Sequence, residues 1–260
     1  MNKKIIALGI IAAMVVSVFC LTGCKKKDFK TEGEMLVVTE ATFPPFDTVD
    51  DAGNIVGFDM DLMEAIAEDQ GFTVKFKDIG FDSLIPALEA NEADIIAAGM
   101  NSIGKTGKAR AKKIDFSDPY FESQLVLLVK ADNSTVTGVA DLTSDMKVAG
   151  QTGTTGADEV TALAEDGKIA EAVVLDKVSD MMLQLQNGDI QAVILDKPVA
   201  ESYIAKQAGI AKIVGDPIGE KEAYAIGVQK GNTVLLDKIN AGLKNLKENG
   251  TYDALVAKWF

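Results

Sequence analysis

The sequence of 260 residues contains no histidine, and its only two cysteines, Cys20 and Cys24, lie within the first 24 positions. Beyond that point the chain cannot form a Cys–His or Ser–His–Asp catalytic site, or a metal site with His or Cys ligands. Acid–base catalysis would have to rely on carboxylates, lysine or tyrosine. These absences exclude many hydrolase and metalloenzyme classes, and we expect neither a metal nor a cofactor.

Arginine is also scarce, because Arg110 is the only one and the other 25 basic residues are lysines. Acidic residues outnumber basic residues by 39 to 26, which leaves a formal net charge of −13. A nucleic-acid-binding protein needs a basic surface that neutralises phosphates. The charge balance therefore argues against a nucleic-acid partner.

The N-terminus has the pattern of an export signal. Lys3 and Lys4 precede an apolar run at residues 5–19, and the residues L-T-G-C that end at Cys24 resemble a bacterial lipobox. The run is marginal for a membrane span, which needs about 20 apolar residues. We predict a signal peptide at 1–23, lipidation of Cys24 and attachment to the outer face of the cell membrane, where two acyl chains make anchoring stable. An ordinary signal peptide with a chance cysteine and an uncleaved anchor are the alternatives.

The rest of the chain is long enough for one large domain or two smaller ones. We read the polar stretch 24–34 as a lipidated cysteine and a tether. Beyond it, short β-rich runs alternate with helical patterns, which predicts an α/β fold with mostly parallel sheets. Strands are expected at 35–39, 72–76, 94–98, 125–130, 147–150, 172–175, 192–196, 212–214 and 224–228, and helices at 59–70, 83–91, 156–165, 179–187, 198–207, 233–248 and 252–260.

Two segments of the chain resemble each other. Residues 87–99 and 184–196 both read as a helix, a small polar turn and a strand, with the same spacing from leucine to strand end. A chance likeness between two ordinary helix–turn–strand units explains them equally well. If they are equivalent, the chain holds two similar sheets, and ligands bind beyond the carboxyl ends of such strands. Gly99 and Asp196 would then face each other across one cleft.

Several motifs, in order along the chain, resemble family 3 extracellular solute-binding proteins, the amino-acid-binding proteins of ABC importers. They are E-A-T-F-P-P-F from Glu40, G-F-D-M-D-L from Gly57, F-D-S-L-I-P-A-L from Phe81, D-F-S-D-P-Y from Asp115 and Q-T-G-T-T from Gln151. The resemblance covers residues 35–260. It implies a monomer with the two-lobed periplasmic-binding-protein fold of type II, which binds a free amino acid by hinge closure and serves a membrane permease. It also implies one lobe at 35–127 plus 225–260, another at 128–224, and hinge strands near 129–131 and 222–224.

A free amino acid carries a carboxylate and an ammonium group on one carbon, so its site needs a bidentate cation and an acidic acceptor. The resemblance assigns the carboxylate to Arg110, six residues before Phe116, and to Gly153, Thr154 and Thr155 at a helix start. It assigns the ammonium group to Asp196, together with the backbone at Ala98–Gly99 and with Asn101. Phe43 and Phe81 would wall the ligand side chain, and Glu40 and Gln151 would reach its far end, where Glu40 favours a polar or cationic amino acid.

Each assignment has an ordinary structural alternative. Arg110 lies in a basic stretch and could be a surface residue, and Asp196 could cap the helix that begins near Pro198. Phe43 and Phe81 could belong to the core. Residues 101–109 also depart from the family, which has a shorter stretch with a threonine before the arginine, so the register of Asn101 is less well defined than that of Arg110.

Three other functions compete with amino-acid binding. Gly99–Thr106 matches the phosphate-loop pattern G-x-x-x-x-G-K-[ST], but exported proteins meet little nucleotide triphosphate, and Gly107 is a poor continuation for the helix that such a loop requires. A dehydratase could share the fold, since a fold does not fix a function. A receptor sensor domain is disfavoured, because neither a membrane span nor a kinase follows in this sequence. We therefore expect a binding protein without enzymatic activity.

Overall fold

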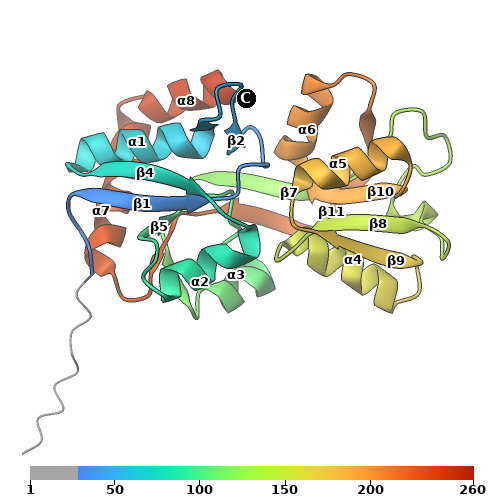
Figure 1. Cartoon of the computed structure of the whole chain (residues 1–260), viewed down its shortest axis with the longest axis horizontal. Coiled ribbons are helices and arrows are strands. Elements are labelled where there is room, and N and C mark those ends of the chain that lie inside the picture. Colours follow the sequence, from blue (N-terminus) through green and yellow to red (C-terminus); the bar gives the residue numbers. More distant parts are fainter. Residues whose placement is uncertain (1–28) are drawn as a thin grey trace, which may run out of the picture.

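The computed structural model describes residues 29–260, which form two α/β lobes joined by two long strands (Figure 1). Each lobe is built on a five-stranded sheet. The predicted mixed α/β architecture with two lobes is therefore confirmed. The predicted signal peptide, the lipidation site at Cys24 and the first part of the tether lie outside the described residues.

The sheet of the first lobe has the strand order β4-β1-β5-β12-β6. Its strands are β1 (Glu34–Thr39), β4 (Thr73–Asp78), β5 (Ile95–Ile96), β6 (Ile114–Phe116) and β12 (Gly227–Gln229). Strand β1 pairs in parallel with β4 and β5, whereas β12 is antiparallel to β5 and β6. The helices of this lobe are α1 (Phe58–Gln70), α2 (Leu84–Glu89), α3 (Gly104–Arg110), α7 (Thr233–Glu248) and α8 (Thr251–Trp259), and a short hairpin consists of β2 (Thr48–Val49) and β3 (Ile55–Val56).

Successive side chains of β1 point to opposite faces of this sheet and enter different apolar clusters. Val37 packs in the cluster that contains Ile66 of α1 and Ile239 of α7, whereas Val38 packs with Leu84 and Leu88 of α2. The apolar faces of these amphipathic helices thus cover both sides of the sheet. This arrangement fixes the position of the loops that follow the strands.

The sheet of the second lobe has the order β11-β7-β10-β8-β9. Its strands are β7 (Phe121–Lys130), β8 (Lys147–Gln151), β9 (Glu171–Leu175), β10 (Ala192–Asp196) and β11 (Ala211–Tyr224), and its helices are α4 (Thr155–Glu165), α5 (Val178–Asn187) and α6 (Lys197–Lys206). Strand β8 is parallel to β9 and β10, whereas β7 is antiparallel to β10 and β11. Short 3-10 turns lie at Phe81–Ser83 in the first lobe and at Val139–Asp141 in the second.

Strands β7 and β11 form the connection between the lobes (Figure 1). Phe121 pairs with Tyr224 and Ser123 with Glu222, so the two chains cross as an antiparallel ribbon. The predicted crossing at 222–224 agrees with this register. The predicted crossing at 129–131 is wrong, because Val129 already pairs with Lys212 and with Ala192 inside the second sheet. The segment opposite Glu222–Tyr224 is instead the start of β7.

Most predicted elements are present within a few residues of their expected bounds, but β11 continues to Tyr224, well beyond its predicted end at 214. Helix α3, strand β6, the β2–β3 hairpin and the 3-10 turn at Val139–Asp141 were not predicted. The expectation that Gly107 disfavours a helix is also wrong, because Gly107 is buried within α3. A Cβ atom at this position would lie 2.1 Å from the carbonyl carbon of Ser102, so the close approach of the preceding loop requires glycine here. The predicted strand at 224–228 is divided between the end of β11 and β12.

Candidate functional site

A cavity between the lobes brings together residues from distant parts of the chain. Its lining comprises Phe43, Phe81, Gly99, Asn101, Arg110, Thr154, Thr155, Asp196 and Glu222. Gly99 and Asp196 thus line one cavity, as the two similar segments predicted. Of the predicted site residues, Glu40, Ala98, Gln151 and Gly153 do not line it, and Glu222 was not predicted as a site residue.

The cavity lies where strands of both sheets end. Gly99 follows β5, Asp196 is the last residue of β10, and Thr154 and Thr155 follow β8. Parallel strands place their carboxyl ends along one edge, where loops and helix starts converge on a ligand. The topology therefore explains why residues so far apart in the sequence share one site.

The Arg110 guanidinium spans the cleft from the last turn of α3. Its Nη1 donates to the carbonyl oxygen of Asn101 at 2.8 Å, and its Nη2 donates to the carbonyl oxygen of Gly153 in the other lobe at 2.9 Å. The guanidinium carbon lies 5.4 Å from the centre of the Phe81 ring, a cation–π contact. Only 8% of Arg110 is exposed, and burial lowers its pKa. Arg110 is thus not a surface residue, and two of its five N–H donors are used by these bonds, which leaves donors for an anion.

Helix α4 begins at the same cavity. Thr154 is its N-cap: the Thr154 hydroxyl accepts the Ala157 N–H at 3.2 Å and donates to the Gln151 carbonyl at 2.7 Å. Thr155 is the first helical residue, and the first N–H groups of a helix have no partners within it. Together with the helix dipole, these groups favour a negative charge. The hydroxyl of Thr154 therefore shapes the helix start, while the backbone can receive an anion.

Asp196 also lines the cavity and is 6% exposed. Its Oδ1 accepts hydrogen bonds from the hydroxyls of Tyr224 and Ser123, the latter at 3.3 Å. Asp196 also precedes helix α6, but its side chain makes no capping hydrogen bond. Burial raises the pKa of Asp196 well above its usual range, and the nearby Glu222 carboxylate raises it further. A buried carboxyl group of this kind gains most from a cationic partner.

Asn101 serves a different purpose from the predicted one. Its Oδ1 accepts the backbone N–H groups of Ile103 at 3.1 Å and Ala223 at 3.2 Å, and its Nδ2 donates to Glu222 Oε1 at 3.2 Å. An amide oxygen has two lone pairs, so both are used. Asn101 therefore holds the walls of the cavity in place, and its side-chain oxygen is not available to a ligand ammonium group.

The Phe43 ring contacts both the apolar core and the cavity. Phe43 is 7% exposed and its ring centre lies 6.0 Å from that of Phe46 in the core. The Phe43 ring also covers Gly99, where φ is 52° and a Cβ atom would lie 2.7 Å from Phe43 Cε1. Glycine at this position thus allows the ring and the backbone to meet at the cavity wall. Ala98 is buried in the core cluster behind this wall.

Glu40 and Gln151 contact each other across the lobes instead of lining the cavity. Gln151 Nε2 donates to Glu40 Oε2 at 2.7 Å, and the Thr42 hydroxyl donates to the same carboxylate. Burial raises the pKa of Glu40, and the hydrogen bonds from Thr42 and Gln151 oppose that effect. Two further hydrogen bonds join the lobes at Thr42, from the Tyr203 hydroxyl at 2.9 Å and from the Val178 N–H at 3.1 Å. The two lobes are therefore closed on each other.

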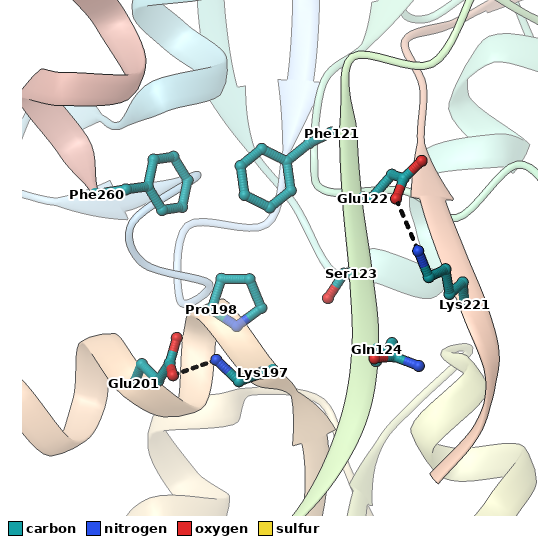
Figure 2. Close-up of a pocket in the computed structure, with 9 residues that line it drawn as sticks. All are labelled: Phe121, Glu122, Ser123, Gln124, Lys197, Pro198, Glu201, Lys221 and Phe260. Carbon is teal, nitrogen blue, oxygen red and sulfur yellow. Dashed lines mark hydrogen bonds and ion pairs between the residues drawn. The ribbon is translucent and has the colours of Figure 1, made fainter. Parts of the chain in front are cut away.

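A larger pocket lies at the β7–β11 ribbon (Figure 2). Phe121, Phe260 and Pro198 form its apolar part. Its charged side chains already pair with each other: Lys197 with Glu201, and Lys221 with Glu122 at 3.4 Å. These pairs are exposed to solvent, so the pocket lacks the buried, unpaired charges of the inter-lobe cavity. The cavity is therefore the stronger candidate for a ligand site.

The phosphate-loop match at residues 99–106 does not form a phosphate cradle. The Ser102 N–H donates to the Ala223 carbonyl at 2.8 Å, and the Met100 carbonyl accepts the Ala225 N–H at 3.1 Å. The loop thus pairs with the segment next to it and does not curl around an anion, as a phosphate loop must. Within residues 29–260 there is no group of three or more acidic side chains arranged to hold a metal ion, and no helix with the length and apolarity of a membrane span.

Residues 35–260 match the model of the bacterial extracellular solute-binding proteins, family 3. The chain belongs to this family. A relative from Neisseria gonorrhoeae, described as a probable histidine-binding protein, is 36% identical over 227 residues, which are 86% of this chain and 82% of the relative. A solved structure of an ancestral arginine-binding protein bound to arginine is 40% identical with a TM-score of 0.82, over 89% of this chain and all of that one.

A third comparison concerns the rival enzymatic function. The ancestral amino acid-binding protein AncCDT-1, a precursor of cyclohexadienyl dehydratase, is 35% identical with a TM-score of 0.79, over 88% of this chain and 96% of that one. The solved structures and the family model together confirm the predicted family and the two-lobed periplasmic-binding-protein fold. These relatives are described as binding proteins for solutes.

Proposed function

We propose that this protein captures a free amino acid between its two lobes, outside the cell membrane, and delivers it to an ABC-type importer. The observation that carries the proposal is the pairing of Arg110 and Asp196 in one buried cavity between the lobes. A guanidinium and a carboxyl group in one cavity complement the carboxylate and the ammonium group of an amino acid. The family supports delivery to an importer, and we further propose that the protein acts as a monomer.

The two ends of the site would receive the ligand in different ways. The Arg110 guanidinium and the first N–H groups of α4 would bind the ligand carboxylate, and Asp196 with the Gly99 carbonyl would accept the ammonium group. Both ligand charges leave water on binding, so each needs a partner of opposite charge. Phe43 and Phe81 would enclose the start of the ligand side chain. Closure would add the contacts of the second lobe to those of the first.

We propose a polar or cationic amino acid as the ligand. Three carboxylates, Glu40, Asp196 and Glu222, lie in or beside the cleft against the single guanidinium of Arg110. The carboxyl groups outnumber the one guanidinium, which favours a ligand with an additional positive charge and disfavours an acidic one. The descriptions of the two similar proteins, one for histidine and one for arginine, support the same class.

Calorimetric titration tests this function. The protein is unfolded and refolded to remove any ligand carried over, and is then titrated with the twenty amino acids, ornithine, cystine and magnesium–ATP. We expect saturable one-to-one binding of one or a few amino acids. Arg110→Ala should weaken that binding by about tenfold or more, because it removes the charged donor of the ligand carboxylate. Absence of amino-acid binding, or binding of magnesium–ATP instead, would contradict the proposal.

We also propose that Cys24 carries lipid and that residues 1–23 are removed as a signal peptide. The motif L-T-G-C directly after the apolar run supports this proposal. Cys24→Ala should release the protein into the medium or the periplasm, because the anchor is lost while the folded lobes are unchanged. Membrane fractionation of cells that express each form measures this. Membrane attachment of the variant as strong as that of the natural protein would refute lipid anchoring.

Dehydratase activity on the same fold is a second candidate. The raised pKa of Asp196 favours it, since a protonated carboxyl group in a cleft is suited to general acid catalysis. The similarity to a precursor of cyclohexadienyl dehydratase is a further reason to test it. Incubation of the protein with its ligand for hours, followed by mass spectrometry, separates the two functions. Loss of ligand mass would favour the enzyme, and recovery of intact ligand supports binding alone.

A further inference from the structure

Glu222 is a buried carboxylate that faces the candidate site. It is 4% exposed, lies near the end of β11 and lines the cavity together with Asp196. Its Oε1 accepts from Asn101 Nδ2, whereas its Oε2 has no hydrogen-bond partner among residues 29–260. A buried carboxylate oxygen without a donor is costly. Glu222 lines this cavity and also a neighbouring pocket with Lys105, Glu159 and Lys221, and a ligand in the cavity can supply a donor.

The backbone around Glu222 is shaped to present this side chain. The register between β11 and β7 shifts between Ile218 and Glu222, as at a β-bulge. Bulges are common next to active sites, where they redirect a side chain. Beyond the shift, Glu222 and Tyr224 share one face of the strand because side chains alternate along it. Ser123 pairs opposite Glu222, and both Ser123 and Tyr224 donate to Asp196.

Asn101 links this carboxylate to the other end of the site. Its backbone carbonyl holds the Arg110 guanidinium, and its side-chain amide holds Glu222. The group proposed for the ligand carboxylate and the group that faces Asp196 are thus fixed by one residue. Such mutual positioning is expected where a site must bind the carboxylate and the ammonium group of one ligand carbon at the same time.

We propose that the Glu222 carboxylate contacts the bound amino acid directly and joins Asp196 in accepting hydrogen bonds from its α-ammonium group. This inference rests on the proposed function. An ammonium group has three N–H donors, and Asp196, Glu222 and the Gly99 carbonyl provide three acceptors for them. Asn101, whose amide oxygen is already used, acts as a positioning residue for Glu222.

The pair has a consequence for the pH dependence of binding. Burial, followed by the charge of the neighbouring Glu222 carboxylate, raises the pKa of Asp196, so the Asp196 carboxyl group favours its protonated form when no cation is present. The hydroxyls of Tyr224 on β11 and Ser123 on β7 donate to Asp196. The charged groups around the pair are Arg110 on α3 and four side chains that line a neighbouring pocket with Glu222, namely Lys105, Glu159, Glu220 and Lys221. A ligand ammonium group would displace the proton of Asp196. The affinity for an amino acid should therefore rise with pH, by up to tenfold per unit for one proton.

Titration of the protein with L-arginine and L-histidine at pH 6, 7 and 8 tests this inference, with melting temperatures as a control for folding. We expect affinity to rise with pH for the natural protein. For Glu222→Gln we expect a smaller rise and a binding about tenfold weaker at pH 8, because the charge that adds to the raised pKa of Asp196 is lost and an amide oxygen is a weaker acceptor than a carboxylate. Glu222→Asp keeps the charge and should keep the rise with pH.

Glu220→Gln is the matched control, since it removes the same charge from an exposed position on the same strand. It should bind as the natural protein does at each pH. If Glu222→Gln matches Glu220→Gln in affinity and in pH dependence while Arg110→Ala loses binding, Glu222 does not contact the ligand and the proposed function stands. If the natural protein binds neither amino acid nor any other, the inference falls together with the function.

Discussion

Asp59 lies directly behind the wall of the cleft and is the most informative single residue outside it. It is 1% exposed, and its Oδ2 accepts the Gly99 N–H at 2.9 Å and the Tyr120 hydroxyl at 2.7 Å. Burial raises its pKa to about 7, although these two hydrogen bonds lower it. Asp47 is fully buried as well, and burial, followed by the charge of Asp59, raises its pKa well above the usual range. The Asp59 carboxyl group, whose pKa is close to neutrality, thus supports the wall of the site at Gly99.

This burial predicts how stability depends on pH. The ordinary pKa of an aspartate is 3.8, and that of Asp59 in the folded state is about 7. Between these values the folded state binds more protons than the unfolded state, so the free energy of unfolding decreases as pH rises. The slope for one proton is at most about 1.4 kcal/mol per pH unit. The Asp59→Asn side chain cannot ionise, so the free energy of unfolding of this variant should decrease less as pH rises. Urea unfolding at pH 4.5, 5.5, 6.5 and 7.5 measures the difference.

The comparison needs a variant that loses the same charge elsewhere. Asp51→Asn removes a carboxylate from an exposed turn, so its free energy of unfolding should change with pH as that of the natural protein does. Exposed carboxylates with lowered pKa values, such as Asp50 and Asp141, act in the opposite direction in both proteins and cancel in the difference. Equal slopes for Asp59→Asn and the natural protein would mean that Asp59 does not bind a proton in this range.

At the scale of elements, sequence reasoning succeeds where periodicity is strong and fails where tertiary contacts decide. Strand β10 and helix α7 have the predicted bounds because a continuous apolar run and a clear helical period specify them. Helix α3 was missed because its composition, with two glycines, disfavours a helix. Packing of Gly107 against Ser102 overrides that preference, and the helix then carries Arg110 into the cleft.

The candidate site follows the same division. Arg110, Asp196 and Gly99 are recognisable from motifs and from the ends of predicted strands, and all three line the cavity. Glu222 was recognised only as part of a hinge, because its role depends on the register shift in β11, which leaves no signal in the sequence. A predicted strand that continued from residue 214 to Tyr224 would have placed Glu222 and Tyr224 on one face, because they are two residues apart.

At the scale of the whole molecule, contacts outside the cavity also hold the lobes together. The Tyr203 hydroxyl on α6 donates to the Thr42 carbonyl of the first lobe at 2.9 Å, and the Val178 N–H donates to the Thr42 hydroxyl. At the other side of the cleft, the Thr106 hydroxyl donates to Asp158 Oδ2 at 2.9 Å. These bonds exist only when the lobes are closed, so they shift the equilibrium toward the closed state before any ligand contributes.

Tyr203→Phe removes one of these closure contacts and leaves the ring in place. A neutral hydrogen bond contributes about 0.5–1.5 kcal/mol net, so the ligand should bind about two- to tenfold more weakly, since more of its binding energy is used to close the lobes. Small-angle scattering of the ligand-free protein should show a larger radius of gyration. Calorimetric titration measures the affinity, and the saturated protein should be as compact as the natural one.

Tyr252→Phe is the control, because it makes the same chemical change at a contact inside the first lobe, where the Tyr252 hydroxyl donates to the Tyr120 carbonyl. Loss of that bond lowers the stability of the lobe but is the same in the open and closed states, so ligand affinity should be unchanged. The contrast between the two variants separates closure from general stability. If both bind the ligand as the natural protein does, the Tyr203 contact does not contribute to closure, and the contacts within the cavity alone hold the lobes together.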